Sequence, residues 1–345
     1  MDNKTKVRNW DIAKGIAILS LLMGNIDGIP PLMKAIIFSF SIPLLFAASD
    51  YCREKYDIKD TLIRSSKSLL APYLAVCLIS ACIAAYRNGD IETNIFVLRD
   101  KLYDMFAGMS EIKGVFENLN TVWLAWIIIC LFLARLIYVL VMQLTKKLPW
   151  FVSLIVIIVL SATGIIISNK IGFLPWSADI ALLSTIFMWA CDNSKHVIDF
   201  SKRFKFSLLI ASLIVITLIP VWIYLVCKDH WSDLASRNYA RDPLCVITAL
   251  LGIFVVLILS MALDKLKYIG SAISWFGKNS LIILIIHCLE SRFFDWEKYI
   301  YPHMPCFISG MWYREMIVKV FFILLVSASV TGIKRLCDMN EYDNK

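Results

Sequence analysis

Long apolar runs alternate with short polar segments along the whole chain. The runs reach roughly 18 residues or more, a length typical of helices that cross a membrane. Most Asp, Glu, Lys and Arg residues fall between the runs. The pattern therefore predicts an all-α integral membrane protein with about ten transmembrane helices. The predicted helices span residues 12–28, 33–51, 68–86, 122–142, 150–168, 176–190, 206–226, 244–263, 269–288 and 316–333.

The composition is that of a membrane protein rather than of a soluble domain. Hydrophobic residues make up 59% and charged residues 18% of the 345 residues, and the mean hydropathy is +0.71. Because no Pro- or Ser-rich linker interrupts the chain, residues 1–345 are predicted to form one membrane domain. The 10 cysteines show no Cys-x-x-Cys motif and lie mostly within apolar runs, so we expect no metal site.

The net charge of +8 is best explained by membrane topology. Basic residues form short clusters after the second, fourth, sixth and eighth predicted helices, whereas the segment 87–120 is acidic. The positive-inside rule places the basic segments in the cytosol. We therefore expect a multi-pass protein of the plasma membrane, with both termini cytoplasmic and with no nucleic-acid partner. The sequence leaves the oligomeric state open.

The first predicted helix carries polar residues at both of its ends. Arg8, Asp11 and Lys14 are spaced three apart and lie close to one stripe at the cytosolic end. Asn25 and Asp27 lie near the other end, and polar residues inside a membrane are costly and often functional. An amide cannot act as a general base, but it can orient a hydroxyl group or donate to an oxyanion. The alternative for these residues is interhelical packing or interfacial charge.

A second set of candidates lies further along the chain. His287 falls inside a predicted membrane helix, where an imidazole is either a general base or a structural hydrogen-bonding group. By the predicted topology it lies near the outer face and acts on an extracytoplasmic acceptor. Arg64 and Lys67 are three residues apart at the cytosolic side, so they suit phosphate binding, although the positive-inside rule alone also explains them.

Several motifs resemble those of the acyltransferase-3 family of integral membrane O-acyltransferases. The first is RNWDIAKG at residues 8–15, followed by Asn25, and the second is FSIPL at residues 40–44. In that family, histidines usually stand at the positions of Asn25 and Ser41, and the first is usually taken as the catalytic base. The opening motif is most similar to the fucose 4-O-acetylase-like subset. Further similarities lie in residues 64–67, 123–125, 174–179, 237–239 and 277–287.

The resemblance implies transfer of an acetyl or other acyl group from cytosolic acyl-CoA to a hydroxyl of a cell-surface or lipid-linked glycan. No metal is implied. Catalytic candidates are Asn25, His287, Asp179 and Asp11; cofactor-binding candidates are Arg8, Lys14, Arg64 and Lys67; substrate-binding candidates are Asp27, Ser41, Trp123, Asn238 and Asn279.

Replacement of the two usual histidines also admits a second interpretation. A catalytically inactive family member would keep the fold and its cavity and act as a polysaccharide or small-molecule exporter or as a scaffold. The two interpretations differ in whether Arg8, Arg64 and Lys67 converge on a cytosolic opening that continues to Asn25 and His287. A path without an acid or base at its far end favours the inactive protein.

Overall fold

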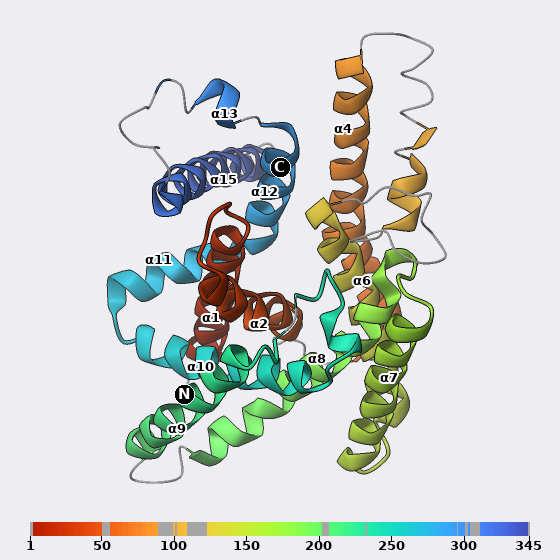
Figure 1. Ribbon diagram of the computed structural model, residues 1–345, viewed down its shortest axis with the longest axis vertical. Coiled ribbons are helices and arrows are strands. Elements are labelled where there is room, and N and C mark those ends of the chain that lie inside the picture. Colours follow the sequence, from red (N-terminus) through yellow and green to blue (C-terminus); the bar gives the residue numbers. More distant parts are fainter. Residues whose placement is uncertain are drawn as a thin grey trace.

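The computed structural model describes residues 3–49, 56–88, 99–100, 102–108, 123–201, 207–231, 233–294, 296–300, 303 and 311–343. The helices and helical turns of these residues make up the whole fold, in agreement with the predicted all-α class (Figure 1). The elements of the first part of the chain are α1 (Asn3–Gly24), α2 (Pro31–Ala48), α3 (Ile58–Ser65), the π-helical turn η1 (Ser66–Leu70) and α4 (Ala71–Asn88).

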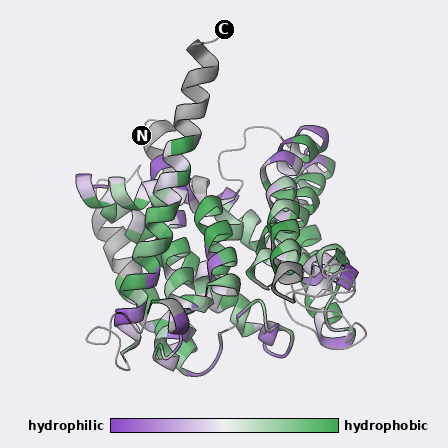
Figure 2. Ribbon diagram, turned by 90° about the horizontal axis from the view of Figure 1, so that it is seen from above, coloured by the Kyte–Doolittle hydropathy of each residue, from purple (hydrophilic) through white to green (hydrophobic). Residues whose placement is uncertain are grey.

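The second part of the chain continues with helices and short 3₁₀ turns. The elements are η2 (Trp123–Ala125), α6 (Trp126–Thr145), α7 (Trp150–Lys170), η3 (Pro175–Ser177), α8 (Ala178–Ser201), α9 (Ser207–Cys227), η4 (Asn238–Ala240), α10 (Leu244–Leu263), α11 (Lys267–Lys278), α12 (Ser280–Phe293), α13 (Trp296–Tyr299) and α15 (Trp312–Asp343). Figure 2 shows apolar residues along the helices and hydrophilic residues gathered towards helix ends and connecting segments, as expected for a protein embedded in a bilayer.

Within the described residues, six helices are long and apolar enough to cross a membrane. They are Pro31–Ala48, Ile58–Ile83, Trp126–Thr145, Trp150–Lys170, Leu244–Leu263 and Trp312–Ile333. The other predicted spans are also helical. Helix α1 carries charged residues in its first half, and the apolar stretch Ile216–Cys227 of α9 is shorter than the six helices above. About ten spans with cytoplasmic termini therefore stay a prediction.

The prediction of one continuous helix over residues 269–288 is corrected by the structure, which has two helices there, α11 and α12, with a bend of 66° between them. The break lies at Asn279, whose backbone has φ −101° and ψ 14°. The Asn279 side chain donates from Nδ2 to the carbonyl oxygen of Trp275 at 2.8 Å. The same carbonyl oxygen accepts from the backbone N–H of Asn279 at 3.1 Å, so the side chain adds a second bond to the last turn of α11. The pair counts as at most one further span, which raises the total to seven.

Two glycines bring α1 and α11 into backbone contact. A Cβ atom on Gly277 would lie 1.7 Å from the carbonyl oxygen of Asp11, and one on Gly15 would lie 2.1 Å from that of Ile273. Small residues at such crossings let membrane helices approach closely. Helix α1 also packs against α2 and α10, while α8 contacts α2, α6 and α7 and so joins the two halves seen in Figure 1. These contacts fix the direction in which the far end of α1 points.

Arg135 on α6 has a partner inside the helical bundle. Its Nη2 donates to the backbone carbonyl oxygen of Ser49, just after α2, at 2.6 Å. A guanidinium group at membrane depth needs such an acceptor. The bond therefore anchors α6 to the end of α2.

Candidate functional site

A polar cavity of about 510 Å³ lies where the end of α1 meets α12 and α15. This volume is in the range of small-molecule sites, about 300–1,000 Å³. Two of the predicted site residues on distant parts of the sequence, Asn25 and His287, both line it. The full set of described lining residues is Leu22, Asn25, Ile26, Asp27, Lys34, His287, Glu290, Ser291, Phe294, Trp296, Glu315, Lys319, Val320 and Ile323.

His287 is held in place by an acid one helical turn further along α12. Its Nδ1 lies 3.1 Å from Oε2 of Glu290, and the second oxygen, Oε1, accepts from the indole Nε1 of Trp296. The three side chains are buried, with 5% of His287, 7% of Glu290 and 6% of Trp296 exposed. Since a carboxylate accepts, the neutral imidazole that fits this contact carries its hydrogen on Nδ1 and keeps a lone pair on Nε2.

Nε2 of His287 is buried and has no hydrogen-bond partner among the described residues. Buried polar atoms are normally paired, so an exception in a cavity wall indicates a place for a ligand. An imidazole with one nitrogen oriented by an acid and the other free is the arrangement of a general base. The geometry can therefore remove a proton from a hydroxyl group in the cavity.

Asn25 contributes an amide to the same cavity. Its Nδ2 donates to the carbonyl oxygen of Leu21 at 2.8 Å, which uses one of the two amide hydrogens and fixes the side chain. The second hydrogen is a donor of the type that stabilises an oxyanion. An amide at this position can donate a hydrogen bond into the cavity but cannot act as a general base.

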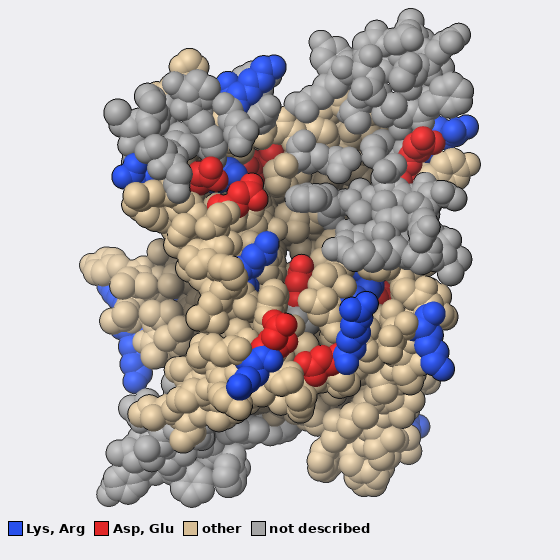
Figure 3. Space-filling view, viewed as in Figure 1, with Lys and Arg blue, Asp and Glu red and all other residues tan. Residues whose placement is uncertain are grey.

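The remaining charges of the cavity wall come from three elements. Asp27 follows α1, Lys34 lies in α2, and Glu315 and Lys319 lie on α15. Nζ of Lys319 is 3.7 Å from Oε2 of Glu315. In Figure 3, acidic and basic side chains gather over α12 and α15, beside this cavity. The wall is therefore rich in groups that can bind hydroxyls.

Arg8, Lys14 and Asp11 form a polar cluster at the other end of α1. Nε of Arg8 lies 2.8 Å from Oδ1 of Asp264, and Nζ of Lys14 lies 3.1 Å from Oδ1 of Asp11. Arg8 also donates to Oγ of Ser271 at 3.3 Å. The 5% exposure of Asp11 makes its carboxylate a buried partner for Lys14, and none of the three predicted residues lines the cavity. The cluster thus joins α1 to the turn before α11.

Arg64 and Lys67 lie on a different part of the protein. Both are exposed, and Nε of Arg64 lies 2.8 Å from Oδ1 of Asp60 one turn earlier. Their elements, α3 and η1, pack against α6. The four predicted cofactor-binding cations are therefore carried by two separate helical segments.

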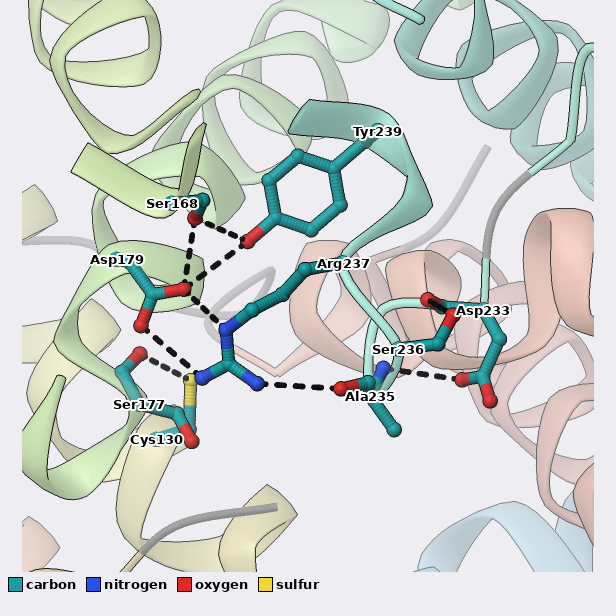
Figure 4. Close-up of polar contacts among 9 residues, drawn as sticks. All are labelled: Cys130, Ser168, Ser177, Asp179, Asp233, Ala235, Ser236, Arg237 and Tyr239. Atoms are coloured by element: carbon teal, nitrogen blue, oxygen red, sulfur yellow. Dashed lines mark hydrogen bonds and ion pairs between the residues drawn. The ribbon is translucent and has the colours of Figure 1, made fainter. Parts of the chain in front are cut away.

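Asp179, a predicted catalytic residue, is fully buried in a hydrogen-bond network outside the cavity (Figure 4). Its Oδ2 accepts from Nε of Arg237 at 2.5 Å, from Oγ of Ser168 at 2.8 Å and from the hydroxyl of Tyr239 at 3.2 Å. Oδ1 accepts from Nη2 of Arg237 at 3.1 Å. The two bonds from Arg237 form the bidentate geometry that suits a carboxylate.

The same network ties the segment before α10 to α7 and α8. Arg237 has a left-handed backbone, with φ 57°, and its guanidinium carbon lies 3.8 Å from the ring centroid of Phe173. Burial, and then the charge of Asp179, raise the pKa of Tyr239 well above its ordinary value, so this hydroxyl stays a donor. Both oxygens of the Asp179 carboxylate therefore have donors within the protein, and its catalytic role stays a prediction.

Three of the four other predicted substrate-binding residues, Ser41, Asn238 and Asn279, are not among the described lining residues of the cavity. Ser41 is buried in α2 and its Oγ has no partner in the described part of the chain. Asn238 is exposed, while Asn279 occupies the break between α11 and α12 and accepts from Thr331 at 3.4 Å. The side chain of Trp123 lies outside the described residues.

Glu290, Trp296, Glu315 and Lys319 were not identified from the sequence. Three of them lie between the predicted helices 269–288 and 316–333, and Lys319 lies in the first turn of the second of these, where charged and aromatic residues are typical of a membrane interface. One signal was present, because Glu290 stands three residues after His287, a spacing that places both side chains on one helix face. Where residues are described, no three His, Cys, Asp or Glu side chains gather as a metal site.

Comparison with known families gives one extensive match. The Acyltransferase domain (Acyl_transf_3) matches residues 7–333, which include both sides of the cavity and the network around Asp179. No curated protein and no solved structure matches the chain.

Proposed function

Because the chain belongs to the acyltransferase-3 family of membrane acyltransferases, we propose that it is an active O-acyltransferase. It takes an acetyl or other acyl group from cytosolic acyl-CoA and transfers it to a hydroxyl of a cell-surface or lipid-linked glycan. The buried, unpartnered Nε2 of His287 in the wall of a polar cavity is the observation that carries this proposal. In this proposal, the protein lies in the plasma membrane, its termini are cytoplasmic and the cavity opens towards the outside.

The reaction begins with proton transfer to His287. Nε2 accepts the proton of the acceptor hydroxyl, while the hydrogen bond from Nδ1 to Glu290 stabilises the resulting imidazolium. The hydroxyl oxygen bonds to the thioester carbonyl carbon, and the carbonyl electrons move onto oxygen to give a tetrahedral oxyanion. The free N–H of Asn25 is the candidate donor to this oxyanion. When the C–S bond breaks, the departing sulfur takes the proton from Nε2, which leaves an ester and a thiol.

Donor binding is assigned first to Arg64 and Lys67. Both cations are exposed and three residues apart, so they can take phosphates without breaking a buried ion pair. Arg8 and Lys14 are already paired with Asp264 and Asp11, and binding there requires a phosphate to displace a carboxylate. This difference makes Arg64 and Lys67 the primary phosphate ligands and Arg8 and Lys14 secondary ones.

The test is hydrolysis and transfer from radiolabelled acetyl-CoA by the full-length protein in detergent. We expect His287→Gln, which conserves size and polarity, to lower the transfer rate by about 10²–10⁴-fold, the usual contribution of a general base. His303→Gln is the matched control, because His303 is exposed and lies outside the cavity. A His287→Gln protein that keeps the native rate contradicts the proposal.

The alternative, a catalytically inactive exporter or scaffold, is favoured by one observation. Asn25, where the family usually has histidine, lines the cavity itself. If the native protein neither hydrolyses nor transfers label and Asn25→His restores turnover, the chain keeps the acyltransferase fold without its activity. Activity in the native protein that is lost in His287→Gln excludes this alternative.

A further inference from the structure

The cavity wall carries charge of both signs in nearly equal numbers. Apart from His287, its described lining residues include three carboxylates, Asp27, Glu290 and Glu315, and two ammonium groups, Lys34 and Lys319. Glu290 faces the interior end, where it holds His287. An anionic acceptor would therefore meet more negative than positive groups on the wall.

Of the two lysines, Lys319 is already paired with a carboxylate. Nζ of Lys319 lies 3.7 Å from Oε2 of Glu315, and both side chains are only partly exposed, at 18% and 23%. Lys34 is exposed, and its Nζ lies 5.9 Å from the ring centroid of Phe38, at the edge of a cation–π contact. An anionic ligand would have to compete with Glu315 for Lys319, and the negative charge of Asp27 in the same wall offsets the positive charge of Lys34. Like charges held together at a binding site are strongly unfavourable and are a common source of specificity.

An aromatic surface completes the wall. Phe294 and Trp296 both line the cavity, with their ring centroids 4.8 Å apart, and Phe294 stacks on Phe322 at 5.5 Å. The indole N–H of Trp296 is engaged by Glu290, and the ring of Trp296 also packs edge-on against Phe322, with centroids 5.3 Å apart, so this part of the cavity lining is apolar. Aromatic faces attract the slightly positive C–H groups of a sugar ring, while the carboxylates, amide and ammonium groups beside them bind its hydroxyls.

We propose that the cavity selects an uncharged sugar ring and rejects acceptors that carry a carboxylate or phosphate next to the reacting hydroxyl. This inference rests on the proposed function, since it names the acceptor class of the same site. Asp27 and Glu315 are the residues that exclude the anionic acceptor. Phe294 and Trp296 hold the ring, and His287 faces the hydroxyl that is acylated.

Binding of two matched sugars tests the inference separately from turnover. Methyl β-glucoside and methyl β-glucuronide differ by one carboxylate, and calorimetric titration into the full-length protein in detergent gives the affinity of each. We expect the glucoside to bind about tenfold or more tightly than the glucuronide. The double variant Asp27→Asn/Glu315→Gln should remove this preference or reverse it. Asp60→Asn/Asp100→Asn removes two exposed carboxylates from residues outside the cavity and should leave the preference unchanged.

The outcomes for the acceptor and for the reaction are distinct. Equal or tighter binding of the glucuronide, or no saturable binding of either sugar, overturns the inference. A preference that survives in Asp27→Asn/Glu315→Gln also overturns it. Tight glucoside binding without label transfer from acetyl-CoA instead contradicts the proposed function and leaves the neutral-sugar site in place.

Discussion

Glu290 Oε2 lies 3.1 Å from His287 Nδ1, one turn away on the same helix, and the opposite imidazole nitrogen is buried without a partner. Glu290 orients the ring, and His287, which lines the cavity, keeps its other nitrogen without a partner among the described residues. Glu290 is thus a positioning residue in the proposed mechanism.

Replacing Glu290 with Gln should lower kcat by about 10–100-fold, because a neutral amide stabilises the imidazolium less than a carboxylate does. The amide also has only one oxygen, so it cannot accept from both His287 and Trp296 as the carboxylate does. KM for the acceptor should change little, since Glu290 acts through His287. Trp296→Phe keeps the ring but removes the bond to Glu290, so its effect on kcat should be smaller. Steady-state kinetics with acetyl-CoA measure both. A change in KM alone for Glu290→Gln would indicate that this acid binds substrate instead.

Asn25→Asp should reduce kcat by about 10²-fold, because a carboxylate in place of an amide repels the oxyanion and removes a donor. Asn25→Gln, with the same amide on a longer side chain, is the milder companion variant. Turnover of radiolabelled acetyl-CoA distinguishes them. Equal rates for Asn25→Asp and the native protein would mean that Asn25 has a packing role.

Arg237→Met should destabilise the protein by about 3–5 kcal/mol, since it leaves the buried Asp179 carboxylate without its cation. The ion pair is almost fully buried, with 3% of the Arg237 side chain and none of the Asp179 side chain exposed. Arg64→Met is the matched control. It breaks the exposed pair with Asp60, and such pairs contribute about 0–1 kcal/mol. Unfolding in detergent, followed by tryptophan fluorescence, compares the variants, and equal midpoints would contradict the structural role of the network.

The lowered pKa of Asp242, which lies just before α10, predicts that the free energy of unfolding depends on pH. Partial burial acts to raise its pKa, but hydrogen bonds from Nδ1 of His230 at 2.6 Å and from the backbone N–H of Leu244 outweigh burial. The folded-state pKa therefore lies below the ordinary value of 3.8. Such a group stabilises the fold above its unfolded pKa, and the contribution is lost as pH falls through the folded pKa.

Asp242→Asn should accordingly lower the unfolding midpoint by a constant amount above about pH 5, and the difference from the native protein should close as pH falls below about 4. Thermal unfolding between pH 3 and 6 measures this. Asp60→Asn, at an exposed position, is the control. A difference that widens in acid would reverse the predicted sign.

The helices were largely predictable because apolar length is a local property of the sequence. The break at Asn279 was not predicted, since an apolar run with one Gly-Lys-Asn interruption is typical of a single helix, and the 66° bend between α11 and α12 has no local hydropathy signal. The number of helices that cross the bilayer depends on how the charged half of α1 is accommodated, which a hydropathy pattern does not determine.

The site was predictable in part. His287 and Asn25 were singled out because polar groups at membrane depth are rare, and both line the cavity. Around Asp179, the sequence pointed to Asn238, but the turn buries its two neighbours, Arg237 and Tyr239, and exposes Asn238. Pairings such as Glu290 with Trp296 depend on how a connecting segment folds back, which no local pattern records.

The contact between Gly277 and the backbone of Asp11 holds the cytosolic half of α1 against α11, so the length of α1 sets the distance between Asp11 and the cavity. Because no methyl group fits at that crossing, α1 and α11 form one rigid pair, and the polar cluster at Asp11 stays at a fixed separation from the cavity at Asn25. At 1.5 Å per residue, that separation is roughly 20 Å. Arg8 lies three residues further from the cavity, so a donor whose charged head rests beside Arg8 must carry its acyl group on an arm of roughly 25 Å. For a donor bound at this secondary site, the number of residues in α1 sets the required reach.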